Sequence, residues 1–103
     1  MPRPCKRRYC RPFDGDRVFK PRSVPMKGLK LTRLELSELE ALRLCDLEGL
    51  SQEEAGARMK VSRGTIQRLT KSGRAKVVGA LLASRAILIE KGANDEDLHP
   101  NDG

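Results

Sequence analysis

Aromatic residues and long apolar runs are scarce in this 103-residue chain. There is no Trp, and Tyr9, Phe13 and Phe19 all precede residue 20, so an aliphatic core is predicted beyond that point. No run of about 18 apolar residues exists, and we expect no membrane-spanning helix. The basic N-terminus lacks the apolar stretch of a signal peptide. Three cysteines, an odd number, favour a reducing compartment, so a cytoplasmic protein is expected.

Patterns typical of enzymes are missing as well. His99 is the one histidine and has no obvious catalytic partner, and no Gly-rich phosphate loop is present. The acid pairs Glu38/Glu40 and Glu53/Glu54 are explained by helix capping and solvation. We therefore expect a protein that is not an enzyme and that requires no cofactor.

Positive charge is abundant but unevenly distributed. The formal net charge is +7 and the pI about 9.8, which is typical of proteins with a polyanionic partner, although many basic proteins are only well solvated. Residues 35–54 contain seven acids and one base, whereas residues 55–89 contain eight bases and no acid. The second segment can therefore approach phosphates without repulsion.

The first 28 residues contain five of the six prolines and nine Lys or Arg residues. Proline lacks a backbone N–H and constrains its neighbour, so we predict an extended basic arm over residues 1–28 without regular structure. A helical domain over 29–90 and a disordered acidic tail over 91–103 would follow. The cations expected to contact phosphates or enter the minor groove are Arg3, Lys6, Arg7, Arg8 and Arg11.

Two capping boxes predict two successive helices. Ser37 with Glu40 predicts a helix from about Glu38 to Glu48, with Leu47 extending its apolar side and Gly49 ending it in a left-handed conformation. Ser51 with Glu54 predicts a short second helix, in which Gly56 is a local weakness.

A third, longer helix is predicted from Arg63 to about Ala83, capped by Ser62. Its buried face recurs at helical spacing and comprises Ile66, Leu69, Gly73, Val77, Ala80 and Ser84. Val78 and Leu82 are apolar but lie off this face, so the N-terminal arm, the segment Ala86–Glu90 or a second subunit should cover them. A homodimer is favoured, because helix-turn-helix proteins commonly dimerise.

A short strand is predicted at "AILIE", Ala86–Glu90, and its partner is expected within residues 29–36. The predicted fold class is therefore mostly α: a three-helix, helix-turn-helix domain with an extended basic N-terminal arm and a short β pairing of flanking segments.

The short helix, a three-residue turn and the long helix match a helix-turn-helix, with Met59, Val61, Ile66 and Leu69 filling the wedge between the helices. Lys60 stands where the turn commonly has Gly, and its left-handed conformation would cost about 1 kcal/mol. The second helix of this motif presents its N-terminal residues to base edges in the major groove. The predicted contacts are Lys60, Arg63, Gly64, Thr65, Gln67, Arg68, Lys71 and Arg74.

Among these contacts, Gln67 can bind adenine, Arg68 can bind guanine, and Gly64 would let the backbone approach closely. The alternative is a solvated basic face on a helical core. Two further alternatives are a protein-interaction module, whose acidic helix 38–48 binds part of the transcription machinery, and an RNA-binding protein. Double-stranded DNA is the favoured partner, and transcriptional regulation the favoured role.

Five segments resemble a family of small prokaryotic proteins predicted to bind DNA: "MPRP" with nearby Arg and Cys, "FKP", "LSELEALRLCDLEGLSQEEA", "VSRGTIQRL" and "AILIE". The helix-turn-helix of that family is similar to region four of sigma factors. The resemblance covers nearly the whole ordered chain. It implies a sigma-region-four-like fold and DNA binding, with no known target.

Cys5 and Cys10 lie among Arg and Lys residues, which lower the pKa of a thiol and favour the thiolate. A metal or redox role is conceivable, with Cys45 and His99 as further ligands, and a structural zinc site requires four. Cys45 lies in a predicted helix beside leucines and is better explained by packing. We therefore expect a plain basic arm and no metal.

Overall fold

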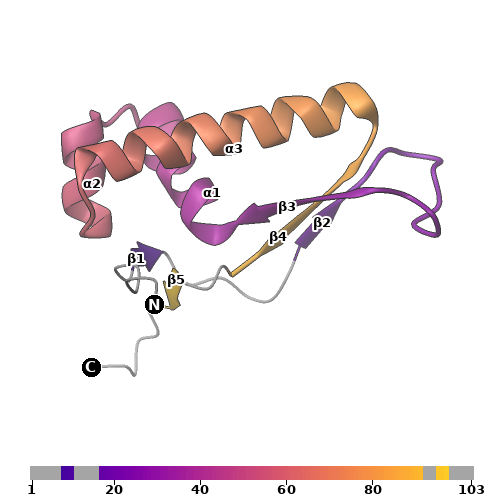
Figure 1. Ribbon diagram of the computed structural model, residues 1–103, viewed down its shortest axis with the longest axis horizontal. Coiled ribbons are helices and arrows are strands. Elements are labelled where there is room, and N and C mark those ends of the chain that lie inside the picture. The colour runs from indigo at the N-terminus through magenta and orange to yellow at the C-terminus, as the bar shows by residue number, and fades with distance from the viewer. Residues whose placement is uncertain (1–7, 11–16, 92–94, 98–103) are drawn as a thin grey trace, which may run out of the picture.

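The protein folds into three helical segments and a small three-stranded sheet, as the mostly α prediction with a short β pairing anticipated (Figure 1). The computed structural model describes residues 8–10, 17–91 and 95–97. The elements are β1 (Arg8–Cys10), β2 (Arg17–Phe19), β3 (Leu31–Glu35), α1 (Leu36–Leu42), the π-helix η1 (Arg43–Leu47), α2 (Gln52–Met59), α3 (Arg63–Ala83), β4 (Ala86–Glu90) and β5 (Asp95–Asp97).

Strand β4 is the centre of the sheet, with β3 parallel to it on one side and β2 antiparallel on the other. The predicted pairing of 86–90 with 29–36 is confirmed, from Leu31 opposite Ala86 to Glu35 opposite Glu90. Parallel strands need a long crossover connection, and here all three helical segments form it. Figure 1 shows α3 lying along the sheet, with α2 at one end of the molecule.

Strand β2 and the pair β1–β5 lie where the sequence predicted no regular structure. β2 falls within the predicted arm, and β1 pairs in parallel with β5 of the predicted disordered tail, from Arg8 opposite Asp95 to Cys10 opposite Asp97. Each of these short strands pairs with a segment about 70 or more positions away in the chain. No local periodicity can signal such a pairing, because the partner supplies the hydrogen bonds.

Helix α1 begins at Leu36, two residues earlier than predicted, so the capping box of Ser37 with Glu40 is wrong. The box is formed by Glu35 and Glu38, and the Glu35 N–H donates to Glu38 Oε1 at 2.9 Å. Ser37 is fully buried inside the first turn. The S-x-x-E spacing of residues 37–40 thus overlaps the E-x-x-E spacing of residues 35–38. The second spacing forms the capping box, and Ser37 is buried within the first turn.

The π-helix η1 continues α1 and changes which side of it is buried. A π turn takes more residues than an α turn, so Leu47 lies further round from the buried Leu44 than α-helical spacing would place it. Leu47 is 80% exposed, and its predicted apolar placement is wrong. Gly49 follows with φ +74°, the left-handed conformation that was predicted.

The core is aliphatic beyond the arm, as the sequence predicted. Its main cluster joins α1, η1, α2 and α3 and contains Leu36, Ala41, Leu44, Ala55, Met59, Ile66 and Leu69. The bounds of α3 are those predicted, but Ser84 is exposed and ends the helix with φ 54°, so its predicted burial is wrong. No helix within the described ranges is long and apolar enough to cross a membrane.

Candidate nucleic-acid interface

A tight turn joins α2 to α3 and determines how the start of α3 is presented. Lys60 adopts φ 58° and ψ 44°, the left-handed conformation that the sequence analysis treated as costly for Lys at this position of the turn. The Val61 N–H donates to the Gly56 carbonyl at 2.9 Å. A Cβ on Gly56 would lie only 2.7 Å from the Val61 carbonyl oxygen, so this close crossing requires glycine.

The start of α3 is capped as predicted. Ser62 Oγ accepts from the Thr65 N–H at 3.1 Å, and the first turn contains no acid. Ile66 and Leu69 are buried in the core, and Val61 packs against it. The predicted wedge between the two helices is therefore confirmed, and it holds one side of α3 firmly against α1 and α2.

The opposite side of α3 is open to solvent. Gly64, Gln67, Arg68 and Lys71 are all exposed, so the sequence placed this face correctly. Thr65 is half-buried, and its Oγ1 accepts from Arg68 Nη2 at 3.2 Å. This contact directs the Arg68 guanidinium back towards the beginning of the helix.

The cations of this surface differ in whether an acid neutralises them. Arg68 and Lys71 form no ion pair with any residue that the structure describes. Arg63 Nη1 lies 3.9 Å from Glu53 Oε1 of α2, which is a long ion pair between two exposed side chains. The positive charge of α3 that no described acid neutralises therefore lies around its second and third turns, at Arg68 and Lys71.

Arg74, also predicted to contact DNA, is held by a carboxylate of η1. Its Nη2 and Nε donate to the two oxygens of Asp46 at 2.6 and 3.0 Å. This bidentate pair holds the pKa of Asp46 below its usual range. Arg74 must leave Asp46 before it can contact another anion with the same atoms.

Arg58 is an exposed cation that the predicted contact set omits. It lies in the last turn of α2, two residues before Lys60. Arg58 belongs to the acid-free run 55–89, and the sequence could have indicated it as a candidate contact for that reason. The predicted arm contacts Arg3, Lys6, Arg7 and Arg11 lie outside the described residues, and Arg8 is described only as part of the β1 backbone.

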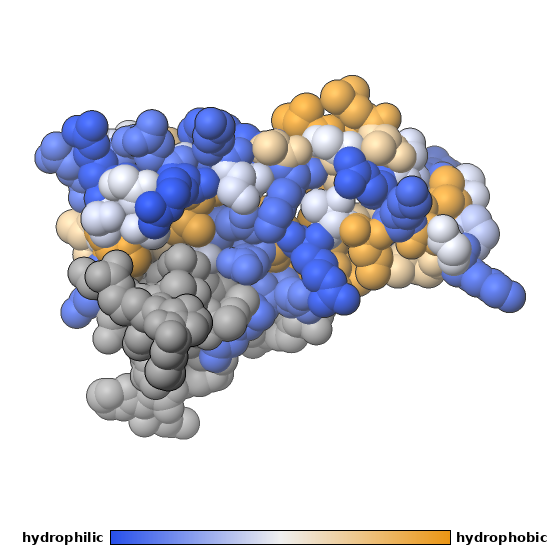
Figure 2. All heavy atoms as spheres, in the orientation of Figure 1, coloured by the Kyte–Doolittle hydropathy of each residue, from blue (hydrophilic) through white to orange (hydrophobic). Residues whose placement is uncertain are grey.

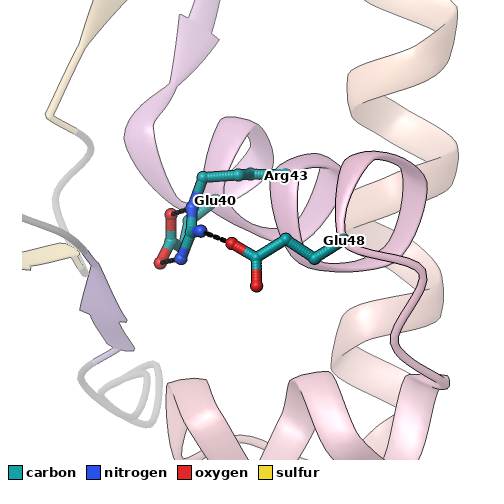
Figure 3. A network of polar contacts seen from close by, with 3 residues as sticks. All are labelled: Glu40, Arg43 and Glu48. Atoms are coloured by element: carbon teal, nitrogen blue, oxygen red, sulfur yellow. Dashed lines mark hydrogen bonds and ion pairs between the residues drawn. The ribbon is translucent and has the colours of Figure 1, made fainter.

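The acids within residues 38–48 contact bases of the same chain. Arg43 donates from Nε and Nη2 to Glu40 at 2.8 and 2.9 Å, and its Nη1 contacts Glu48 (Figure 3). These contacts raise the pKa of Arg43, the one base of this acidic segment. The nearly buried Glu38 binds Lys76 Nζ at 2.7 Å and also accepts from Ser72 Oγ.

Cys45 is half-buried and packs against the core cluster, as predicted. Burial raises the pKa of its thiol, so the reactive thiolate is disfavoured. Within the described residues, no three His, Cys, Asp or Glu side chains are grouped to hold a metal ion. Cys5 and His99 lie outside the described residues, as does the side chain of Cys10.

Comparison with known proteins places the chain in a family of uncharacterised proteins. The model of the family described as "Protein of unknown function DUF134" matches residues 1–97. A UPF0251 protein of Thermoanaerobacter pseudethanolicus is 49% identical over 100 residues, covering 94% of this chain and 85% of that protein. A UPF0251 protein of Dehalococcoides mccartyi is 43% identical over 100 residues, covering 97% and 86%. No solved structure matches significantly. The chain belongs to this DUF134/UPF0251 family.

Proposed function

We propose that the protein binds double-stranded DNA through a helix-turn-helix formed by α2, the turn 60–62 and α3. The observation that carries the proposal is the outward face at the start of α3. There Gln67 lies beside Arg68 and Lys71, two cations without an acidic partner among the described residues. The resemblance to sigma-factor region four, stated above from sequence motifs, agrees with it.

The charge at the start of α3 is better explained by an anionic ligand than by stability. Cations near a helix N-terminus oppose the helix dipole by about 0.3–1 kcal/mol each, and the effect fades beyond the first turn. Arg63 occupies the first helical position, and no acid of α3 compensates for it. A phosphate would offset this repulsion, because it attracts both the cation and the N-terminus of the helix.

The contacts of the acidic residues favour DNA binding over the alternative in which the acidic helix 38–48 binds a protein partner. Each of the four acids within residues 38–48 already has a basic partner: Arg43 for Glu40 and Glu48, Arg74 for Asp46, and Lys76 for Glu38. A basic protein partner would have to compete with these contacts. We further propose that the protein is a transcriptional regulator, since occupancy of a specific site can block or recruit polymerase.

Selection of bound sites from a random DNA pool, followed by affinity measurements on single-base variants, tests the proposal. Gln67→Ala and Arg68→Ala should each cost about 1–3 kcal/mol on the selected site and relax the preference at one or two positions. Lys71→Ala should weaken binding to all sequences about equally, because a lysine one turn further along is suited to phosphate.

Lys27→Ala is the matched control, because Lys27 is exposed in the loop between β2 and β3 and its removal causes the same loss of charge. Its affinity should stay close to that of the wild type, and the melting temperatures of all variants control for folding. If Gln67→Ala and Arg68→Ala bind every DNA variant with the affinity of the wild type, the proposal is refuted. Tighter binding to structured RNA than to any duplex would favour the RNA alternative.

A further inference from the structure

The first turn of α3 differs from that of α2 at its third position. Both helices are capped by serine, and Ser51 forms a full capping box with Glu54, the third residue of α2. In α3 the third residue is Thr65, which has no carboxylate to complete such a box with Ser62. A Glu at this position would satisfy one more N–H and interact favourably with the helix dipole. Stability of the helix start therefore does not explain Thr65.

The Thr65 hydroxyl instead contacts a cation on the outward face of α3. Its Oγ1 accepts from Arg68 Nη2 at 3.2 Å and lies 3.0 Å from Ser62 Oγ. No acid among the described residues forms an ion pair with Arg68, so the hydroxyl holds the guanidinium and leaves its charge intact. A Glu at position 65 would form an ion pair with Arg68, three residues further along, and would neutralise it.

The two hydroxyl groups also leave one proton for an outside acceptor. Only one hydroxyl proton can lie between Ser62 Oγ and Thr65 Oγ1, whichever oxygen donates it. The second proton points elsewhere, and Arg68 keeps the N–H groups that Thr65 does not accept. The first turn of α3 thus presents donors and no carboxylate, and Figure 2 shows hydrophilic side chains gathered where α2 meets α3. The far half of α3 is different, because it exposes the apolar Val78, Leu81 and Leu82.

We propose that Thr65 is a positioning residue, which holds Arg68 at the start of α3 so that its guanidinium selects guanine at one position of the DNA site. The inference rests on the proposed function, in which Arg68 reads a base edge. Guanine fits because its N7 and O6 are both acceptors in the major groove, and an arginine can donate to both at once. A side chain that is held before binding loses less conformational freedom on binding. Thr65 therefore increases the selectivity of Arg68.

The contact with Arg68 can be measured without DNA. Nitrogen-15 relaxation of the Arg68 Nε–H reports how ordered the end of this side chain is. Thr65→Val keeps the branched shape and the N–H that Ser62 accepts, but it removes the hydroxyl. We expect Arg68 to be more mobile in Thr65→Val than in the wild type, and Thr65→Ser to keep it ordered. Equal order in the wild type and Thr65→Val would overturn the proposal.

Selectivity is measured on the selected DNA site and its single-base variants. Thr65→Val should reduce the preference for guanine by about two- to tenfold at the position that Arg68→Ala relaxes, because one long side chain must then be immobilised on binding. The slope of log affinity against log salt should stay that of the wild type, since no charge is lost. Thr65→Ser should restore most of the preference. In the Arg68→Ala background, Thr65→Val should change the preference no further, whereas a purely structural effect would persist there.

Thr65→Glu separates stability from recognition. Its carboxylate should complete the capping box with Ser62 and raise the melting temperature. It should also pair with Arg68, so that affinity for duplex DNA falls and the salt slope becomes shallower by up to ~0.9. A Thr65→Glu variant that binds DNA as tightly as the wild type would contradict the argument from charge.

Failure of this inference can be told apart from failure of the proposed function. If the wild type selects no duplex, or Arg68→Ala relaxes no position, both are refuted. If Arg68→Ala relaxes a position at which Thr65→Val keeps the wild-type preference, only the role of Thr65 is refuted. An equal loss in Thr65→Val and Thr65→Ser would exclude the hydroxyl as the cause, and a preferred base other than guanine would overturn the assignment of the base.

Discussion

The crossing of α2 and α3 offers the sharpest test of the structure, through Gly56. Helix propensity alone predicts that Gly56→Ala stabilises α2, by about 0.8–1.0 kcal/mol. The structure predicts the opposite, because the new Cβ would lie 2.7 Å from the Val61 carbonyl oxygen. Backbone must move to relieve this contact, and overpacking of this kind costs typically about 1–3 kcal/mol.

We expect Gly56→Ala to be destabilised by up to about 2 kcal/mol after the propensity gain is subtracted from the cost of overpacking. For a domain of this size, each kcal/mol lowers the melting temperature by roughly 4–8 °C. The displacement would also strain the Val61 N–H bond to the Gly56 carbonyl and so shift the start of α3. Thermal unfolding followed by circular dichroism measures the change.

Gly64→Ala is the matched comparison, because its new Cβ would meet nothing closer than Ser62 Oγ at 3.9 Å. Here propensity acts without a clash, so stability should rise by up to about 1 kcal/mol. DNA affinity should fall if the backbone approaches DNA closely at this position. A Gly56→Ala variant that is more stable than the wild type, as helix propensity alone predicts, would refute the reasoning about the crossing.

The turn and the ion pairs yield three further predictions. Lys60→Gly should raise the free energy of unfolding in urea by about 1 kcal/mol, because glycine adopts φ 58° without a Cβ penalty, and a loss of stability would contradict this. Asp46→Asn should release Arg74, strengthen DNA binding and steepen the salt dependence by up to ~0.9 in log–log slope; an unchanged slope would place Arg74 away from phosphate. Arg74 lowers the pKa of Asp46, so this pair stabilises the fold above the unfolded carboxyl's pKa of about 3.9, and its contribution is lost as the pH falls through the lower folded value. Wild type and Asp46→Asn should differ by at most about 1 kcal/mol near neutral pH and converge in acid, and a difference independent of pH would rule out this origin.

Helices α2 and α3 were predictable because their signals are local. Ser51 with Glu54, and Ser62 before an apolar face, satisfy backbone N–H groups within one turn, so the start of each helix is encoded in a few consecutive residues. The exposed face of α3 follows from the same periodicity. The polar set from Gly64 to Lys71 was therefore found without knowledge of the partners of α3.

Other features depended on contacts between distant parts of the chain. Strand β2 and the β1–β5 pair exist because their partners supply hydrogen bonds, and Arg74 is neutralised because α3 crosses near η1 and its Asp46. Helix propensity identified Gly56 as a weak point of α2, whereas the close crossing of α2 and α3 requires glycine at this position. The amino-acid sequence by itself determined the local helix starts and the charge of the outward face, since both depend on neighbouring residues. Only the tertiary structure decided which of those charges stay unpaired, because that depends on which distant side chains are brought within reach.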